Sequence, residues 1–262
     1  MPPAPQGEGP PLLSVAGAVA SIRLRRPSLR NSLDDDDLQI LLEHFAAVDA
    51  DERIRVLVLG AETRGQPRPV FSAGYHVGGL DRSGAGPQRF ERVPDALENL
   101  RPLTLCAMNG SVYGGATDLV LACDLRVALS GCEWRMPAAA LGLHYYPTGL
   151  RRYVARFGVD LAKRAFLTAQ PLPVEELAAA GVFLQVAPAA GFDAAVDALV
   201  ATAAALAPLA AQATKRSLTE LAAGRFDEPA LRERERLTQS SHDFAEGRAA
   251  FAERRAPRFT GS

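Results

Sequence analysis

Short apolar runs that alternate with helical segments constrain the fold of this chain more than any other feature. The runs RIRVLVLGA (53–61), PLTLCAMNG (102–110) and DLRVALSG (124–131) are apolar over most of their length, which is typical of buried strands. A segment with apolar residues at helical spacing, LQILLEHFAAVDAD, precedes the first run, and VYGGATDLVLACD (112–124) enters a helix. This alternation predicts an α/β core.

The chain divides into three expected regions. The start, MPPAPQGEGPP (1–11), is rich in proline and glycine and predicts a disordered tail. SVAGAVASIRL (14–24) predicts a strand, so the α/β core is expected over 12–205. The last third of the chain has a helical pattern and ends in a charged amphipathic helix near 228–250. Residues 206–262 are therefore expected to form a helical region for trimerisation or a lid.

A long glycine-rich loop is expected over 61–88, around the short strand VFSAG. Loops of this length inside a compact domain are usually functional or mobile. In an α/β core, the two glycine-bearing strand ends at 71–75 and 110–115 can meet at one site.

Composition and charge argue against several classes of partner. The 262 residues carry a net charge of −1, so we expect neither a nucleic-acid nor a membrane partner. The three cysteines lie in apolar surroundings and predict small buried side chains, with no disulfide framework and no metal site. No apolar run reaches the roughly 18–20 residues of a membrane span. The start does not resemble a signal peptide, and we expect a cytoplasmic protein.

The stretch VYGGATDLVLACD places two glycines and Asp118 where a helix begins. One interpretation is helix capping, because an acidic side chain interacts favourably with a helix N-terminus. The other is a catalytic site, in which glycines expose backbone N–H groups that hold a developing negative charge. The stretch alone favours capping.

Several segments together resemble the crotonase (enoyl-CoA hydratase/isomerase) superfamily. FSAG, NGSVYGGATDLVLACDLRVA, MPAAALGL and FLTAQPLPVEELAAAGVFLQVAP match it in order and spacing, and ATKRSL and FAEGRAAFAERRAPRFTG resemble its final helices. The resemblance covers roughly 12–260. It implies a spiral of ββα units with a helical C-terminal region, assembly as a homotrimer or homohexamer, and an acyl-CoA substrate without a further cofactor.

The resemblance also implies where the thioester lies. Its oxygen would be held by two backbone N–H groups, those of Tyr75 and Gly115, while an enolate forms. Losing one such donor typically costs about 3–4 kcal/mol of transition-state stabilisation. Asp118, three residues beyond Gly115, is expected to overhang the same site. The matched loops imply that Ala73, Gly74 and Gly114 also contact the substrate.

The sequence departs from the family pattern at two positions that carry catalytic glutamates. Members that hydrate enoyl-CoA carry two glutamates, at the positions of Asp118 and Ala138, which orient water and move protons. Here the first is shortened and the second is absent. This favours decarboxylation or double-bond isomerisation over standard hydration, with Asp118 as acid/base. The alternatives are a hydratase with a single acid and a catalytically degenerate acyl-CoA-binding protein.

Three polar residues beside the matched motifs are further candidates. His76 follows the oxyanion-hole residue, His144 lies in the LHYY segment, and histidine suits proton transfer near neutral pH. Tyr145 matches a tyrosine of methylmalonyl-CoA decarboxylases. Each can equally be a loop residue or a pocket wall without a chemical role.

Basic and aromatic residues are expected to bind the CoA moiety. Arg30 matches a family position near the nucleotide end of CoA. Lys215, Phe251 and Arg254 lie in C-terminal segments that touch adenine and phosphates in this family, sometimes from a neighbouring subunit. Positive side chains there would pair with phosphate oxygens, but a solvated helix face explains each of them equally well.

Overall fold

Two β-sheets and nine α-helices make up the part of the chain that the computed structural model describes, which is 7–76 and 85–262, with the backbone alone for 85–87. The six-stranded sheet has the order β1-β2-β3-β5-β7-β10, and the four-stranded sheet has the order β4-β6-β8-β9. The strands are β1 (Gly9–Ala16), β2 (Val19–Arg25), β3 (Val56–Ala61), β4 (Val70–Ser72), β5 (Leu103–Met108), β6 (Ser111–Tyr113), β7 (Leu125–Leu129), β8 (Glu133–Arg135), β9 (Leu172–Pro173) and β10 (Gln185–Ala187). The helices are α1 (Asp35–Ala50), α2 (Ala85–Glu98), α3 (Ala116–Ala122), α4 (Pro147–Thr168), α5 (Val174–Ala179), α6 (Ala189–Ala204), α7 (Pro208–Ala222), α8 (Glu228–Gln239) and α9 (His242–Glu253).

Successive turns of the chain each add one strand to both sheets. β3, β5 and β7 are parallel neighbours in the larger sheet, and β4, β6 and β8 are parallel neighbours in the smaller one. A helix follows each of the first two pairs, α2 after β3–β4 and α3 after β5–β6. This arrangement confirms the expected spiral of ββα units.

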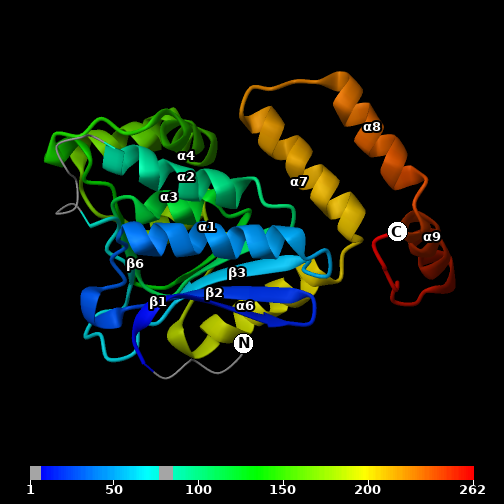
Figure 1. The fold of residues 1–262 in the computed structure, drawn as a ribbon, viewed down its shortest axis with the longest axis horizontal. Helices are drawn as coiled ribbons and strands as arrows, with labels where there is room; N and C mark the ends of the chain where they lie inside the picture. The colour runs from blue at the N-terminus through cyan, green and yellow to red at the C-terminus, as the bar shows by residue number, and fades with distance from the viewer. Residues whose placement is uncertain (1–6, 77–84) are drawn as a thin grey trace.

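Both faces of the larger sheet are buried, which explains the continuous apolar runs. Leu57, Leu59 and Cys106 belong to the main core with α1–α4, whereas Val58 and Leu105 pack with α6 on the opposite face. Figure 1 shows α6 below the sheet and α1–α4 above it.

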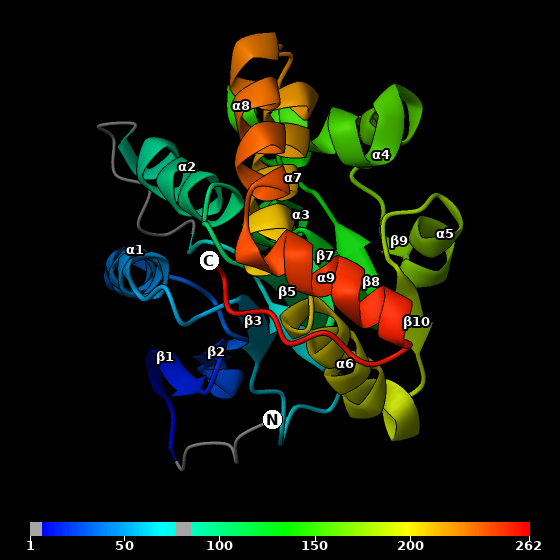
Figure 2. The same ribbon diagram turned by 90° about the vertical axis from the view of Figure 1, so that its right-hand side faces the viewer.

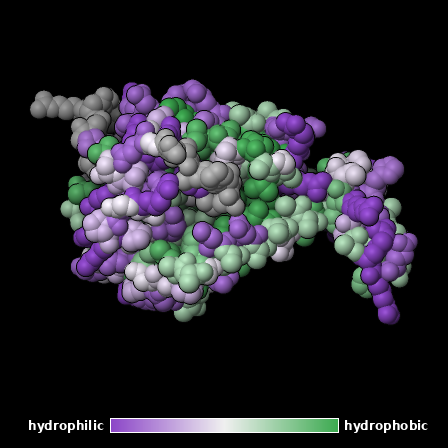
Figure 3. Space-filling model, turned by 90° about the horizontal axis from the view of Figure 1, so that it is seen from below, coloured by the Kyte–Doolittle hydropathy of each residue, from purple (hydrophilic) through white to green (hydrophobic). Residues whose placement is uncertain are grey.

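The C-terminal helices extend away from this body. Figure 1 shows α7–α9 projecting to one side, and Figure 2 shows α7 and α8 side by side. Hydrophobic side chains concentrate on the surface beside the projecting helices (Figure 3). Leu206 and Leu209, at the junction of α6 and α7, and Leu218, near the end of α7, are exposed. In the described residues no single helix is long and apolar enough to cross a membrane, and only the pair α6–α7, bent by 104°, meets that test jointly by length and composition.

Several boundaries differ from those predicted. The single strand expected at 14–24 is a hairpin of β1 and β2, because Gly17 adopts a positive φ of 59° and turns the chain. Of the expected tail 1–11, residues 1–6 lie outside the described residues, but 9–11 belong to β1. Pro10 and Pro11 are tolerated there because β1 is an edge strand with an irregular register after Gly9.

Two helical assignments are also corrected. Part of the expected loop 61–88 and the residues after it form α2, which encloses Pro94. The expected helix near 228–250 is two helices, because Ser241 caps α9 by accepting a hydrogen bond from the Phe244 N–H. The helix expected over LQILLEHFAAVDAD is confirmed as α1, which begins in the acidic run 34–37. Asp34 is its N-cap, in a reciprocal capping box with Asp37.

Gly110 is predicted to be essential where the two sheets connect. An added Cβ would lie 2.6 Å from the Phe71 nitrogen and 2.7 Å from the Val70 nitrogen, both in the backbone of β4. We expect Gly110→Ala to lower the free energy of unfolding by about 2–3 kcal/mol, because the backbone of β4 cannot move aside. Denaturant unfolding measures this.

Gly191→Ala is the matched control. Gly191 lies in α6, and an added Cβ meets nothing within 4 Å. Alanine there should be neutral or stabilise the protein by up to about 1 kcal/mol. Equal effects of the two substitutions would contradict the packing described for Gly110.

Candidate functional site

The two glycine-bearing loops meet, as predicted. β4 and β6 pair in parallel, Ser72 opposite Val112, so the chain leaves both strands at the same edge. Gly74 follows with a positive φ of 93°, and an added Cβ would lie 2.7 Å from the Tyr113 oxygen and 3.2 Å from the Gly115 nitrogen. Only glycine permits this approach.

Gly115 presents a backbone donor at the start of α3. It is the N-cap residue of that helix, and among the described residues none accepts a hydrogen bond from its N–H. The Gly114 N–H, in contrast, donates to the Arg135 oxygen at 2.9 Å. An N–H at a helix N-terminus is suited to hold a developing negative charge.

Tyr75 is anchored by its side chain. Its hydroxyl donates to Asp35 Oδ1 at 2.6 Å, and Arg89 of α2 donates to the other oxygen of Asp35 at 2.5 Å. Its ring packs 5.9 Å from that of Phe90. The acidic run at the start of α1 therefore connects the loop of Tyr75 to α2, in addition to capping α1.

A cavity of about 130 Å³ lies beside these loops. Its walls come from the loops after β4 and β6, from α2 and from the segment before α4. Among the described residues that line it, none is an aspartate or a glutamate. Seven of the predicted site residues line this cavity together, namely Ala73, Tyr75, Gly114, Gly115, Ala138, His144 and Tyr145.

Asp118 lies behind the cavity wall. Its carboxylate is fully buried in the first turn of α3, and Arg152 of α4 binds both oxygens, Nε to Oδ1 at 2.8 Å and Nη2 to Oδ2 at 2.6 Å. It does not line the cavity, so the expectation that it overhangs the site is corrected. The reason is that the short side chain of Asp118 is held in an ion pair with the buried guanidinium of Arg152, away from the cavity. Its catalytic role stays a prediction.

Tyr146, which the sequence analysis did not select, connects Asp118 to the cavity. Its hydroxyl donates to Asp118 Oδ2 at 2.6 Å, and the Tyr145 hydroxyl donates to the Tyr146 oxygen at 3.0 Å. The two rings stack with centroids 4.2 Å apart. Gly149 makes room for them, because an added Cβ would lie 2.4 Å from the Tyr145 ring. The sequence signals for this pair were the repeated tyrosine before Pro147 and the family match of Tyr145.

Burial shifts the pKa values of Asp118, Tyr145 and Tyr146 and opposes the hydrogen bonds that raise the pKa of Arg152. It raises the pKa of the Asp118 carboxyl, an effect that the hydrogen bonds from Arg152 oppose. Burial acts to lower the pKa of Arg152, but its hydrogen bonds to Asp118 outweigh this and raise it. Burial also raises the pKa of the Tyr145 and Tyr146 phenols well above the ordinary value. Both phenols therefore keep their protons at neutral pH.

The remaining predicted residues near the cavity differ in position. Ala138 presents a buried methyl group to the cavity, where a carboxylate would stand in a hydratase pair. His144 lines the cavity and is otherwise exposed. His76 is exposed, its N–H donates to the Leu33 oxygen, and it does not line the cavity.

A second, basic cavity of about 700 Å³ adjoins the first. Its lining includes Arg30, Arg64 and Arg68. The Arg30 guanidinium lies 5.7 Å from the centroid of the Tyr113 ring, and Tyr113 lines both cavities. The two cavities therefore lie on either side of the Tyr113 ring, with the positive side chains in the second one.

The three predicted C-terminal residues do not reach either cavity in the single chain. Lys215 of α7 is buried, with its ammonium 2.8 Å from Asp124 Oδ2 and donating to the Pro102 oxygen. Phe251 and Arg254 are exposed at the end of α9, which Figure 1 shows far from β6. Their contact with CoA stays a prediction for an assembly of subunits.

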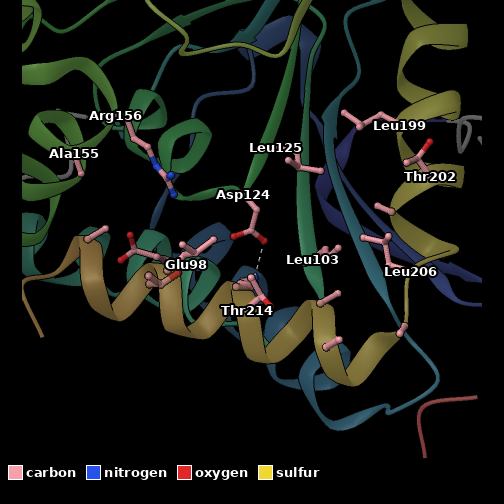
Figure 4. Close-up of a pocket in the computed structure, with 18 of the residues that line it drawn as sticks. Glu98, Leu103, Asp124, Leu125, Ala155, Arg156, Leu199, Thr202, Leu206 and Thr214 are labelled. Atoms are coloured by element: carbon pink, nitrogen blue, oxygen red, sulfur yellow. Dashed lines mark ion pairs between the residues drawn. The ribbon is translucent and has the colours of Figure 1, made fainter. Parts of the chain in front are cut away.

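A larger apolar cavity of about 700 Å³ separates α7 from the body of the protein (Figure 4). Leu103, Leu125, Leu199 and Leu206 line one part of it, and Figure 4 shows the ion pair of Asp124 reaching across to α7. Glu98, Arg151 and Arg152 line its other end. No glycine-flanked backbone donor faces it among the described residues, so it lacks the chemistry of the smaller site.

Comparison with known proteins gives consistent results. The enoyl-CoA hydratase/isomerase family pattern matches residues 14–262. The chain is 31% identical over 257 residues to the mitochondrial enoyl-CoA hydratase domain-containing protein 2 of Bos taurus, covering 93% of this chain and 84% of that protein. It is 27% identical to the 2,3-dehydroadipyl-CoA hydratase of Escherichia coli, covering 93% and 95%. An enoyl-CoA hydratase/isomerase family structure from Hyphomonas neptunium superimposes with a TM-score of 0.88 at 26% identity, covering 97% and 98%, which confirms the crotonase-type fold.

Asp118→Asn is predicted to destabilise the protein. It removes the carboxylate that neutralises a guanidinium whose side chain is 1% exposed, and breaking a buried pair typically costs 3–5 kcal/mol. Because Arg152 retains Glu98 and Asp95, we expect a loss of about 3 kcal/mol in urea unfolding.

The control for this prediction is an ion pair in solvent. Arg53, whose side chain is 85% exposed, pairs with Asp51 at 2.8 Å. Arg53→Gln should change stability by less than about 1 kcal/mol. A loss below about 1 kcal/mol for Asp118→Asn as well would show that the buried pair contributes no more than a surface one.

Proposed function

This chain belongs to the enoyl-CoA hydratase/isomerase family, and we propose that it decarboxylates or isomerises its acyl-CoA substrate rather than hydrating it. The family match and the relatives named above support action on a CoA thioester. The proposal depends on the cavity of about 130 Å³ beside the two glycine-bearing loops, here called the acyl cavity. None of the described residues that line it carries a carboxylate. Addition of water needs such a group to take a proton from the water.

Decarboxylation fits the groups that do line the cavity. In a thioester with a carboxylate on Cα, the bond between Cα and the carboxylate carbon breaks and CO₂ leaves. The electron pair moves into the thioester as an enolate, whose oxygen would accept hydrogen bonds from the Gly115 and Tyr75 N–H groups. Cα then takes a proton from the Tyr145 hydroxyl, which turns from the Tyr146 oxygen towards Cα, and a proton from water restores the phenol. A methyl group at Ala138 leaves room for the substrate carboxylate without repulsion.

Isomerisation of a double bond is the second candidate. It requires a group that removes one proton and returns another, and the imidazole of His144 at the cavity wall is a side chain that can do both. Asp118 would take part through Tyr146, because it touches the cavity only by way of that hydroxyl.

Incubation of the protein with a panel of CoA thioesters, followed by mass spectrometry, tests this proposal. The panel contains crotonyl-, dienoyl-, 3-hydroxyacyl-, 3-oxoacyl- and malonyl-type compounds. Loss of about 44 mass units from a malonyl-type compound would identify decarboxylation, and chromatographic change at constant mass would identify isomerisation. Gain of about 18 on crotonyl-CoA as the fastest reaction would contradict the proposal and indicate a single-acid hydratase. CoA binding without turnover would indicate a degenerate acyl-CoA-binding protein.

Binding of CoA through the basic cavity is proposed as well. It is supported by Arg30, Arg64 and Arg68 in the lining of a cavity that shares Tyr113 with the acyl cavity. We expect Arg30→Ala to weaken CoA binding about tenfold in calorimetry, because a charge-assisted contact to phosphate contributes about 1.5–3 kcal/mol.

Arg53→Ala provides the matched control for binding. Arg53 lies outside both cavities and pairs with Asp51. It should leave CoA affinity unchanged. Equal loss in both variants would indicate a general effect of charge, and no loss in either would remove Arg30 from the site.

Assembly and location follow as further proposals. Exposed apolar residues on α7 and in the connection that follows it, including Leu218, Leu221 and Phe226, support a homotrimer or homohexamer. We also propose a cytoplasmic location and no cofactor beyond the CoA of the substrate.

A further inference from the structure

One continuous chain of hydrogen bonds leads from the acyl cavity into the protein. Tyr145 donates to Tyr146 at 3.0 Å, Tyr146 donates to Asp118 at 2.6 Å, and Arg152 donates twice to the same carboxylate. Each link is buried or nearly so. The direction of the chain is fixed by its inner end, because an ionised carboxylate can only accept.

Arg152 is held from its other side by α2. Its Nη1 donates to Asp95 Oδ1 at 2.7 Å and to Glu98 Oε2 at 3.1 Å, and Arg151 pairs with Glu98 as well. The guanidinium is thus fixed in the plane that presents two N–H groups to Asp118. The cluster links α2, α3 and α4 behind the tyrosine pair.

We propose that Arg152 is a positioning residue that keeps Asp118 ionised and thereby sets the orientation of the two tyrosine hydroxyls at the acyl cavity. A protonated Asp118 could donate to Tyr146, and the hydroxyls would no longer be held in one arrangement. Only the predicted effect of Arg152 on turnover rests on the proposed function. Its effect on the carboxyl of Asp118 is independent of any substrate.

The balance between the ionised and the protonated form of Asp118 depends on all charged and titratable groups that face it. Arg152 from α4 favours the ionised carboxylate, whereas burial and the nearby Glu98 from α2 disfavour it. Tyr146 donates to it, and Tyr145 and Tyr153 lie close by as neutral phenols. Because the other influences remain, loss of the guanidinium must shift the balance towards the protonated acid.

The test is Arg152→Gln, studied by two readouts. Carboxyl ¹³C NMR of aspartate-labelled protein, assigned by comparison with Asp118→Asn, should show the pKa of Asp118 rising by about 1–3 units. The acid limb of the pH–rate profile, on whichever thioester the wild-type protein turns over, should move upward by the same amount. An unshifted carboxyl resonance in a folded Arg152→Gln protein would overturn the proposal.

Two further variants separate positioning from a merely structural role. Arg164→Gln removes another arginine of α4, which pairs with Glu176 at the surface and touches neither Asp118 nor Glu98, so both readouts should match those of the wild type. Arg152→Lys keeps the charge without the paired N–H groups, so it should retain the wild-type pH profile at reduced kcat. If Arg152→Gln does not fold, Arg152→Lys decides: a wild-type kcat, or an acid limb that moves although the positive charge is kept, contradicts the proposal.

Failure of the proposed function would look different. A shifted Asp118 carboxyl in Arg152→Gln, with no turnover of any thioester by the wild-type protein, would support the positioning of Asp118 and reject the enzymatic role.

Discussion

The buried pair of Arg152 and Asp118 is the interaction on which the rest of the site depends. It joins α3, which carries the Gly115 donor, to α4, whose preceding segment carries the tyrosine pair. Breaking such a pair strands a charge in a low-dielectric interior, so the two helices are fixed relative to one another. The same contact withdraws Asp118 from the cavity. The ion pair of Arg152 and Asp118 therefore fixes α3 and α4 and keeps the Asp118 carboxylate out of the cavity lining.

The spiral of ββα units explains why the two donors meet. Each turn places one strand in either sheet, so loops 71–75 and 110–115 leave neighbouring parallel strands at one edge. Glycine at 74 and 115 then lets the two backbones and the Phe90 ring approach closely. The larger apolar cavity beneath α7 has greater volume but no such arrangement, which shows that volume alone does not identify the site.

The sequence allowed much of the fold and part of the site to be predicted. Apolar runs identified the buried strands, because that signal is local. The glycine-bearing strand ends were compatible with a common site, and the resemblance to a known family implied that the two loops meet there. The direction of Asp118 was not predictable, since it depends on Arg152, which lies 34 residues away in the chain. Tyr146 was missed for the same reason, as its role arises from a contact with a different helix. Lys215 looked like a phosphate ligand, but tertiary packing buries it against Asp124.

The most direct test is a crystal structure with a stable analogue of a malonyl-type CoA thioester. The account predicts the carbonyl oxygen about 2.7–3.1 Å from the Gly115 and Tyr75 nitrogens, with the carboxylate beside Ala138 and the tyrosine pair. It also predicts that Asp118 remains on Arg152. A carbonyl oxygen remote from Gly115, or an Asp118 carboxylate swung into the cavity against the substrate, would contradict it.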